Sequence, residues 1–392
     1  MAIVLVSIGI ASAQFNLPTN ARISALAGAH VSDISGVYRY PVLMTGYTDH
    51  IQATWGGLDG FVGIKSISDM LSIGVLANQG PMAPEFTEAA VTRLNAYPSL
   101  NQPAAAAASY NNEVVIPHLL LGFDLGAVAI GADLFFEYGG YSAESTDTTK
   151  YNGSLSTPGF KISGKFDVAS AVIMAKFGMG FPSINGEGPA ATQKLTSDKG
   201  TYIETGAEAS ISGGGADWVL GLCYTQAGYR FKLGDVSDVD LISRSLLNAY
   251  AGVEFNFVET AVAALGYSIS RNALTASQPG QSGEPSQTAI NYSHNIYAGV
   301  ENAWEKAWVF DAFQLRGGAL YSITANGGEN KAPSPALNPS YSQPARHSNV
   351  APVVGIGVSK AFATVDVSLN PGAWGGLFTG PDVAMATATV KF

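Results

Sequence analysis

The chain has 392 residues, with 20 Lys and Arg against 30 Asp and Glu and a formal net charge of −10. Charged residues make up 13% of it, about half the usual share in soluble proteins, whereas the hydrophobic fraction of 47% is ordinary. The basic residues form no cluster, which argues against a nucleic-acid partner, and the single Cys223 excludes a disulfide within the chain. This composition favours alternating strands whose outer face needs no water.

The first thirteen residues have the pattern of a secretory signal peptide. Ile3 to Ile10 form an apolar core, and Ala11-Ser12-Ala13 is a small-residue cleavage site, so we expect cleavage after Ala13. No Lys or Arg precedes the apolar core, and a buried first strand is the alternative interpretation. No later stretch approaches the roughly 20 apolar residues of a spanning helix. We therefore expect a secreted chain, either periplasmic, extracellular or in an outer membrane.

Residues 14–48 precede the first predicted strand and show no clear alternation of apolar and polar residues. Their glycines would allow tight packing inside a closed ring of strands. Arg22, Asp33 and Arg39 could pair there with side chains of opposite charge that line the lumen. The sequence predicts a plug or hatch within a barrel, with an extended periplasmic tail as the alternative.

The stretch NARISALAGAHVSDISGVYRYPVLMTGY, residues 20–47, resembles the N-terminal region of the FadL-like outer-membrane proteins. That group includes long-chain fatty acid transporters and PorV-type secretion components, and an Arg…Ala-Leu-Gly-Gly-Ala…Asp…Asn-Pro-Ala pattern precedes their barrel. The matching residues are Arg22, Ala25, Leu26, Gly28, Ala29, Asp33 and Pro41. Ala27 replaces the first Gly of the pair, and Tyr40-Pro41-Val42 stands where Asn-Pro-Ala would. The resemblance implies a fourteen-stranded barrel with an N-terminal plug, but not fatty-acid transport, because the group is functionally broad.

Residues 49–392 are predicted to form an all-β, transmembrane antiparallel barrel of about fourteen, or else sixteen, strands. Along residues 127–138, for example, Ile130, Leu134 and Phe136 lie on one face and Asp133 and Glu137 on the other. The apolar face would meet lipid and the polar face the lumen. Because every backbone polar group in hydrocarbon needs an internal partner, such strands can span a membrane only as a closed ring.

Short turns alternate with long polar connections along this region. Tight turns are predicted at Asp124–Gly126 and Gly213–Gly215 and near Val258, Glu305 and Lys360. The predicted long loops are Phe86–Asn112, Ser142–Pro158, Pro182–Gly200, Lys232–Arg244, Asn272–Thr288, Ala325–Asn349 and Asn370–Gly380. Turns in the periplasm and loops outside are the asymmetry of outer-membrane barrels. A soluble secreted β-sandwich is the alternative, but such a fold gives no reason for short turns at one end and long loops at the other.

The last ten residues, VAMATATVKF, alternate in the same way and end on an aromatic residue. Val390 and Phe392 resemble the C-terminal signature that the barrel-assembly machinery recognises, and closure requires this strand to pair with the first. Aromatic residues beside the short turns would form a girdle at the membrane surface, with packing in a soluble core as the alternative: Trp218, Phe257, Trp304 and Trp308.

Ionisable residues on the inward faces are the candidates for lining or gating the lumen. The candidate residues on the strands are Asp133, Glu137, Glu204, Glu208, Glu254, Glu301, Arg316 and Asp366, with Lys161, Lys165, Lys176 and Lys391 as further cations. If they line water, the excess of carboxylates would favour cations. The alternative is that each is paired and only maintains the shape of the barrel.

No constellation of residues suggests catalysis. The five histidines are scattered, and the sequence has neither a Gly-x-Ser-x-Gly elbow nor a Cys-x-x-Cys pair, so we expect no enzyme, metal or cofactor. The sequence predicts an outer-membrane channel or transporter for small or hydrophobic solutes, gated by its N-terminal segment. Its expected partners are outer-membrane lipid, the assembly machinery and the solute. The alternative is a non-conducting structural, secretion-complex or surface-binding barrel that displays long loops.

Overall fold

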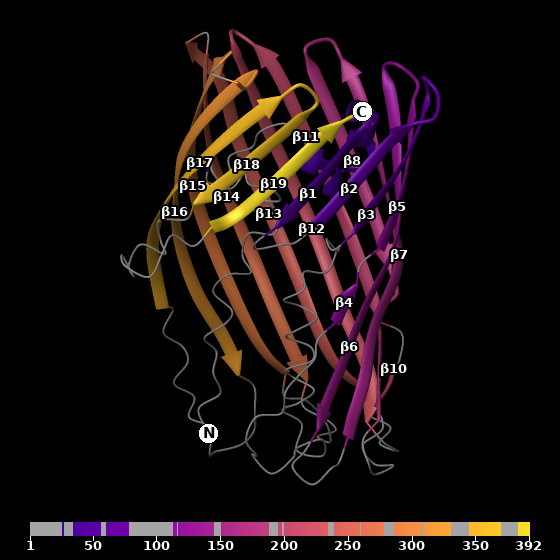
Figure 1. The fold of residues 1–392 in the computed structure, drawn as a ribbon. Coiled ribbons are helices and arrows are strands. Elements are labelled where there is room, and N and C mark those ends of the chain that lie inside the picture. The colour runs from indigo at the N-terminus through magenta and orange to yellow at the C-terminus, as the bar shows by residue number, and fades with distance from the viewer. Residues whose placement is uncertain are drawn as a thin grey trace.

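The computed structural model describes residues 26, 34–55, 60–77, 113–115, 117–144, 150–187, 195–197, 200–233, 239–258, 260–277, 286–306, 309–330, 345–369 and 383–392. Within these ranges, two short 3-10 helices, η2 (Ile34–Tyr38) and η3 (Pro41–Gly46), precede a single antiparallel sheet that curls into a barrel (Figure 1). None of the helices so described is long and apolar enough to cross a membrane.

The sheet is assembled from nineteen strand segments. They are β1 (His50–Trp55), β2 (Gly60–Ser66), β3 (Leu71–Ala77), β4 (Glu113–Val115), β5 (Pro117–Asp124), β6 (Val128–Glu144), β7 (Lys150–Val168), β8 (Ala171–Gly180), β9 (Ser183–Glu187), β10 (Leu195–Ser197), β11 (Thr201–Gly213), β12 (Ala216–Leu233), β13 (Val239–Val258), β14 (Ala261–Ser277), β15 (Ser286–Glu305), β16 (Ala312–Asn330), β17 (Ala345–Lys360), β18 (Ala363–Leu369) and β19 (Val383–Lys391). Three pairs of segments, β4–β5, β8–β9 and β10–β11, are interrupted single strands because both members pair with the same neighbour. Nineteen segments less three gives sixteen strands.

The ring closes between the first and last strands. β1 pairs with β2 on one side and with β19 on the other, from His50 opposite Lys391 to Trp55 opposite Ala386. The backbone N–H of Phe392 donates to the carbonyl of Asp49 at 3.0 Å, which extends this ladder by one residue. The predicted pairing of last strand with first is confirmed. The strand number is the higher of the two predicted values and exceeds the fourteen implied by the resemblance.

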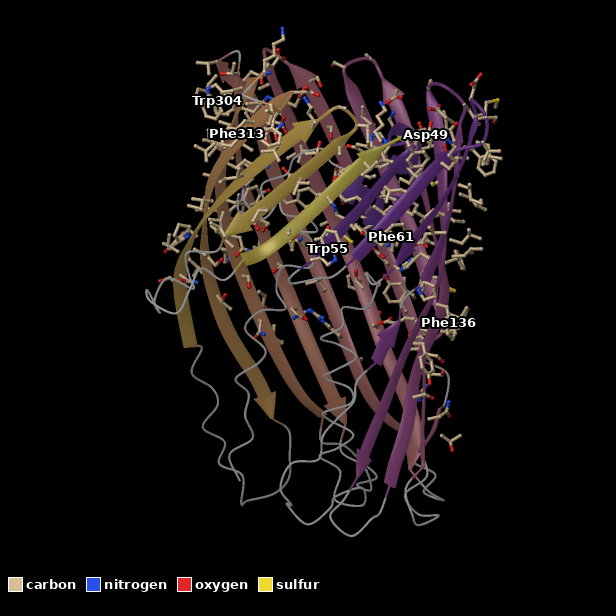
Figure 2. The ribbon with its side chains drawn as sticks, in the orientation of Figure 1. Asp49, Trp55, Phe61, Phe136, Trp304 and Phe313 are labelled. Atoms are coloured by element: carbon tan, nitrogen blue, oxygen red, sulfur yellow. The ribbon has the colours of Figure 1, made fainter. Side chains whose placement is uncertain are left out.

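The two faces of the ring differ in polarity as the alternation predicts. On β6, Leu134 and Phe136 are 50% and 45% exposed, whereas Asp133 and Glu137 on the opposite face are 3% and 2% exposed. Figure 2 shows Phe136 on the outside of the ring. A soluble β-protein would have apolar residues inside, so this inverted arrangement identifies a barrel that spans a membrane.

One end of the ring is closed by short turns, and we call it the short-turn end. The five predicted tight turns are confirmed there, and a further turn joins β7 to β8. Gly126, Gly214 and Gly215 adopt positive φ angles of 87°, 66° and 80°, which glycine tolerates without steric cost. Trp304 and Phe313 lie at this end, with ring centroids 5.8 Å apart, as expected for an interfacial girdle (Figure 2). Trp308 lies outside the described residues.

The opposite end, which we call the loop end, has a rim of uneven height. β12 to β16 have 17–20 residues each, whereas β1, β2, β3, β18 and β19 have 6–9 and stay near the short-turn end (Figure 1). Several long loops were predicted too long, because strands extend into them. In the predicted loop Ser142–Pro158, for instance, β6 continues to Glu144 and β7 begins at Lys150. Backbone pairing continues in these polar segments although the contrast between the two faces is gone.

Candidate functional site

Residues 34–47 of the N-terminal segment pack against inward-facing residues of the barrel. Ile34, Val37 and Met44 form a buried apolar cluster with Val62 of β2, Ile64 of β2, Leu76 of β3 and Leu120 of β5. Burial of these side chains provides the hydrophobic free energy that holds the segment against the wall. The wall strands contribute their inner faces only, since their outer faces carry the exposed apolar residues.

Backbone groups of this segment also bond to the wall. The N–H of Val42 donates to Ser163 Oγ on β7 at 2.8 Å, and Lys161 Nζ donates to the carbonyl oxygen of Tyr38 at 3.1 Å. Gly131 on β6 makes the approach possible, because a Cβ at that position would lie 2.1 Å from the nitrogen of Val42. A glycine is therefore required opposite η3 for the segment to lie this close.

Leu26 lies on a different part of the wall. It packs with Ala264 of β14 and Tyr297 of β15, next to Gly299, where a Cβ would lie 2.9 Å from the Leu26 carbonyl oxygen. Residues 26 and 34 therefore contact different sides of the lumen, separated by only eight residues of chain.

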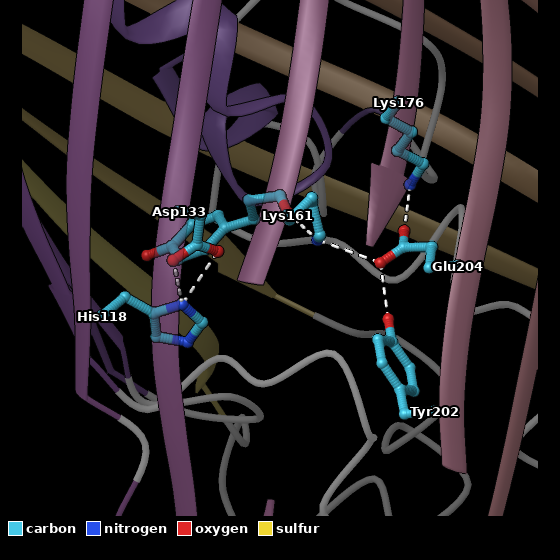
Figure 3. A network of polar contacts seen from close by, with 7 residues as sticks. His118, Asp133, Lys161, Lys176, Tyr202 and Glu204 are labelled. Carbon is cyan, nitrogen blue, oxygen red and sulfur yellow. Dashed lines mark hydrogen bonds and ion pairs between the residues drawn. The ribbon is translucent and has the colours of Figure 1, made fainter. Parts of the chain in front are cut away.

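The inward faces of β5–β8 and β11 form what we call the charged wall. Lys161 of β7 and Lys176 of β8 both pair with Glu204 of β11, the first at 3.1 Å (Figure 3). Tyr202 donates its hydroxyl to the same carboxylate at 2.5 Å. All four side chains are almost fully buried. Burial of charged groups costs desolvation free energy, and the hydrogen bonds and ion pairs among these residues offset that cost.

A second pair lies beside this cluster. His118 Nδ1 is 2.8 Å and 3.0 Å from the two carboxylate oxygens of Asp133, and both side chains are buried (Figure 3). The other ring nitrogen of His118 has no hydrogen-bond partner among the described residues. Glu137, four residues further along β6, is also buried and faces inward.

Arg39 of the N-terminal segment lies next to the carboxylate of Glu208 on β11. The guanidinium is 4.0 Å from Glu208 Oε2, and its side chain remains 23% exposed while that of Glu208 is 3% exposed. Tyr250 of β13 donates its hydroxyl to the same carboxylate. The pair connects the N-terminal segment to the wall at the border of the charged wall.

Arg316 of β16 holds two carboxylates on the other side of the ring. Its guanidinium donates to Glu301 of β15 and, at 2.5 Å, to Asp366 of β18. Gly357 leaves room for this group, because a Cβ there would lie 2.4 Å from the Asp366 carboxylate. The forked donor set of arginine thus reaches two acceptors within four consecutive strands, β15 to β18, and passes over Gly357 of β17.

Apart from Arg316 and Glu301, the inner faces of β13–β16 carry a group of buried amide and hydroxyl side chains, and we call this region the amide wall. Its buried members are Asn248, Ser268, Ser270, Asn272, Asn291, Ser293 and Asn295. Asn295 donates to Ser268 at 3.3 Å and accepts from Ser322 at 2.8 Å. Arg244 is a buried cation on this wall, and it donates to Asn272 at 3.0 Å.

Exposed ion pairs are found at the short-turn end. Hydrogen bonding from Lys65, 2.7 Å away, lowers the pKa of Asp49 below its usual value. The backbone N–H of Ala361 donates to Asp311 at 2.5 Å and, with Lys360 nearby, lowers the pKa of that carboxyl group. Both carboxylates are stabilised in their charged form by donors from a neighbouring strand or turn.

A cavity of about 510 Å³ opens at the seam of the ring, beside the last residues of β19. Its lining residues are His50, Ala361, Phe362, Thr364, Thr389, Lys391 and Phe392. Lys65 Nζ lies 5.0 Å from the ring centroid of Phe392, which places this aromatic side chain next to a cation at the short-turn end.

The predicted luminal residues are thus gathered into three groups around the ring. Glu204 and Asp133 lie in or beside the lysine cluster, Glu208 meets Arg39, and Glu301 and Asp366 meet Arg316. Glu254 is half-buried on β13. Arg22 and Asp33 lie outside the described residues. Val390 pairs with Ile51 across the seam.

Three luminal tyrosines were not among the predicted site residues: Tyr202, Tyr250 and Tyr297. Each is buried on an inward face, where tyrosine adds a hydroxyl to an otherwise charged or amide lining. The alternation of side chains along a strand could have identified them, because Tyr250 is an even number of residues from Asn248 and Glu254 and so lies on the same inward face. This alternation predicts which face a residue lies on but not which residues it will contact.

No family model matches this sequence, and no curated protein matches it either. The fold is similar to a FadL homologue of Pseudomonas aeruginosa, with 11% identity, 96% of this chain and 99% of that chain covered, and a TM-score of 0.48. It is also similar to the CymD monoaromatic hydrocarbon channel, with 11% identity, 95% of this chain and 97% of that chain covered, and a TM-score of 0.41. For CdiB from Escherichia coli the identity is 10%, 88% of this chain and 62% of that chain are covered, and the TM-score is 0.45. At these identities the likeness concerns fold alone.

Proposed function

We propose that this chain is an outer-membrane channel or transporter for small or hydrophobic solutes, and that its N-terminal segment, residues 14–48, gates the lumen as a plug. The observation that carries the proposal is the packing of residues 34–47 against the inner faces of β2, β3 and β5–β7. A segment that occupies the lumen controls what passes through it. The outer-membrane location is supported by the closed ring with its apolar outer face.

The gating role can be tested by pushing the segment off the wall without altering the lipid-facing side. Gly131→Ala places a methyl group 2.1 Å from the backbone nitrogen of Val42, so η3 must move. Gly317→Ala is the matched control, because a Cβ there meets nothing within 4 Å. We expect Gly131→Ala to raise single-channel conductance in planar bilayers above both the wild type and the control.

Equal conductance in the three proteins would contradict gating by this segment. Before recording, each variant is checked for assembly by its heat-modifiable migration in gels, so that a loss of folding is recognised as such. Val390 and Phe392 remain the predicted signal for the assembly machinery.

The alternative is a non-conducting barrel that displays its loop end to partners or within a surface or secretion complex. The uneven rim favours it: β13 and β15 have 20 residues each, whereas about 9–11 residues suffice to cross a bilayer. The long strands therefore extend the wall beyond the membrane on one side. Absence of conductance in correctly assembled wild type and in Gly131→Ala would favour this alternative.

A further inference from the structure

We propose that Glu208, Tyr250 and Tyr297 form a binding site for a guanidinium or alkylammonium group, which Arg39 of the N-terminal segment fills as an internal ligand. A cationic solute in the lumen would compete with Arg39 for this site. The inference deepens the proposed function, on which it rests for the solute's access through the lumen, and names the class of ligand.

The carboxylate is the centre of the site. Glu208 is buried on β11 and faces the lumen, and Tyr250 donates its hydroxyl to one of its oxygens. Burial disfavours an isolated carboxylate charge, so a cation beside Glu208 stabilises its charged form. The guanidinium of Arg39 is the cation present, at 4.0 Å.

Two glycines on neighbouring strands leave the space that the two tyrosine rings occupy. Gly221 of β12 lies opposite Glu208 on one side and opposite Tyr250 on the other, and a Cβ there would be 2.1 Å from the Tyr250 ring. Gly266 of β14 is opposite Tyr297, and a Cβ there would also be 2.1 Å from the ring. Each ring therefore lies across its neighbouring strand, and both lean toward β11.

The carboxylate of Glu208 lies between the Arg39 guanidinium, at 4.0 Å, and the donating hydroxyl of Tyr250, and the Tyr297 ring leans toward the same strand. A carboxylate combined with tyrosine rings is the combination that recognises organic cations, because both the charge and the ring faces attract them.

Two further observations indicate a site that accepts a ligand. The hydroxyl of Tyr297 is buried and has no hydrogen-bond partner in the described structure, although its ring is almost fully enclosed. Such a group costs free energy until a ligand satisfies it. The ion pair of Arg39 is long, and its side chain is 23% exposed, so a solute can reach and replace it.

The test measures binding of n-butylguanidinium to the full, detergent-solubilised barrel by titration calorimetry, with N-butylurea as the neutral probe of the same shape. Arg39→Met removes the internal ligand and keeps the aliphatic stem. We expect it to bind butylguanidinium about ten-fold more tightly than the wild type, because the site is no longer occupied. Butylurea should bind neither protein measurably.

Arg39→Met combined with Glu208→Gln is expected to lose this gain. No gain in Arg39→Met, or a gain that persists in the double variant, would overturn the proposal. If Arg39→Met does not assemble, Glu208→Gln alone decides: it should abolish the weaker binding of the wild type, and unchanged binding would overturn the proposal. Binding in detergent requires no conductance, so its failure is distinguishable from failure of the channel function.

Discussion

The charged wall and the amide wall belong to the same ring but accommodate buried polar groups in different ways. On the charged wall, Lys161 and Lys176 share the carboxylate of Glu204 as a partner. On the amide wall, Asn295 and its neighbours share neutral hydrogen bonds across adjacent strands. Loss of one side chain therefore removes a counter-charge from buried ammonium groups in the first case and only neutral hydrogen bonds in the second. The charged wall should be the rigid side of the lumen, and it is the side that contacts η3.

The largest effect is expected from Glu204→Gln. The substitution keeps the shape of the side chain but removes the carboxylate that two buried ammonium groups share. We expect the free energy of unfolding to fall by about 3–5 kcal/mol. Urea unfolding in lipid vesicles, followed by tryptophan fluorescence, measures the change. A loss below about 1 kcal/mol, the range of exposed pairs, would show that these lysines find other partners or water.

A smaller effect is expected from Asn295→Ala on the amide wall. The substitution removes the bonds to Ser268 and from Ser322 but leaves no unpaired charge. The loss in the free energy of unfolding should be about 1–2 kcal/mol. The same unfolding experiment compares it directly with Glu204→Gln, and equal losses would contradict the proposed difference between the walls.

The smallest effect is expected at the short-turn end, outside both walls. The folded-state pKa of Asp311 is lowered by the Ala361 N–H, so this carboxylate stabilises the fold above its unfolded pKa. The stabilisation is lost as the pH falls through the lower, folded-state value. Asp311→Asn should therefore be slightly less stable than the wild type near neutral pH and equally stable below the folded-state pKa, so that this acid-side part of the pH dependence disappears. Parallel pH profiles of unfolding for wild type and variant would refute the contribution.

The sequence was sufficient for the ring because its alternation is strongest where lipid imposes it. On β6, the contrast between Phe136 and Glu137 is visible without any knowledge of neighbouring strands. The ends of the strands were not predictable in the same way. Beyond the apolar band both faces are polar, so residues 150–158 look like a loop although they pair with β6.

The contacts of the site were predictable only in part. Parity placed Glu204 and Glu208 on the inner face, four residues apart on β11. The partner of each depends on the register between strands and on the position of residues 34–47, neither of which alternation specifies. Glu204 thus receives two wall lysines, whereas Glu208 receives a tyrosine and Arg39. Arg39 was a candidate from its charge, but its location required the fold.

The rings of Tyr250 and Tyr297 lie where Gly221 and Gly266 have no side chain. Neither member of such a pair can change alone, since a bulkier residue at the glycine collides and a smaller one at the tyrosine leaves a void. In distant relatives of this chain, each glycine and its tyrosine should accordingly be inherited or replaced together. That joint variation would leave a trace in sequence comparisons even where overall identity has decayed.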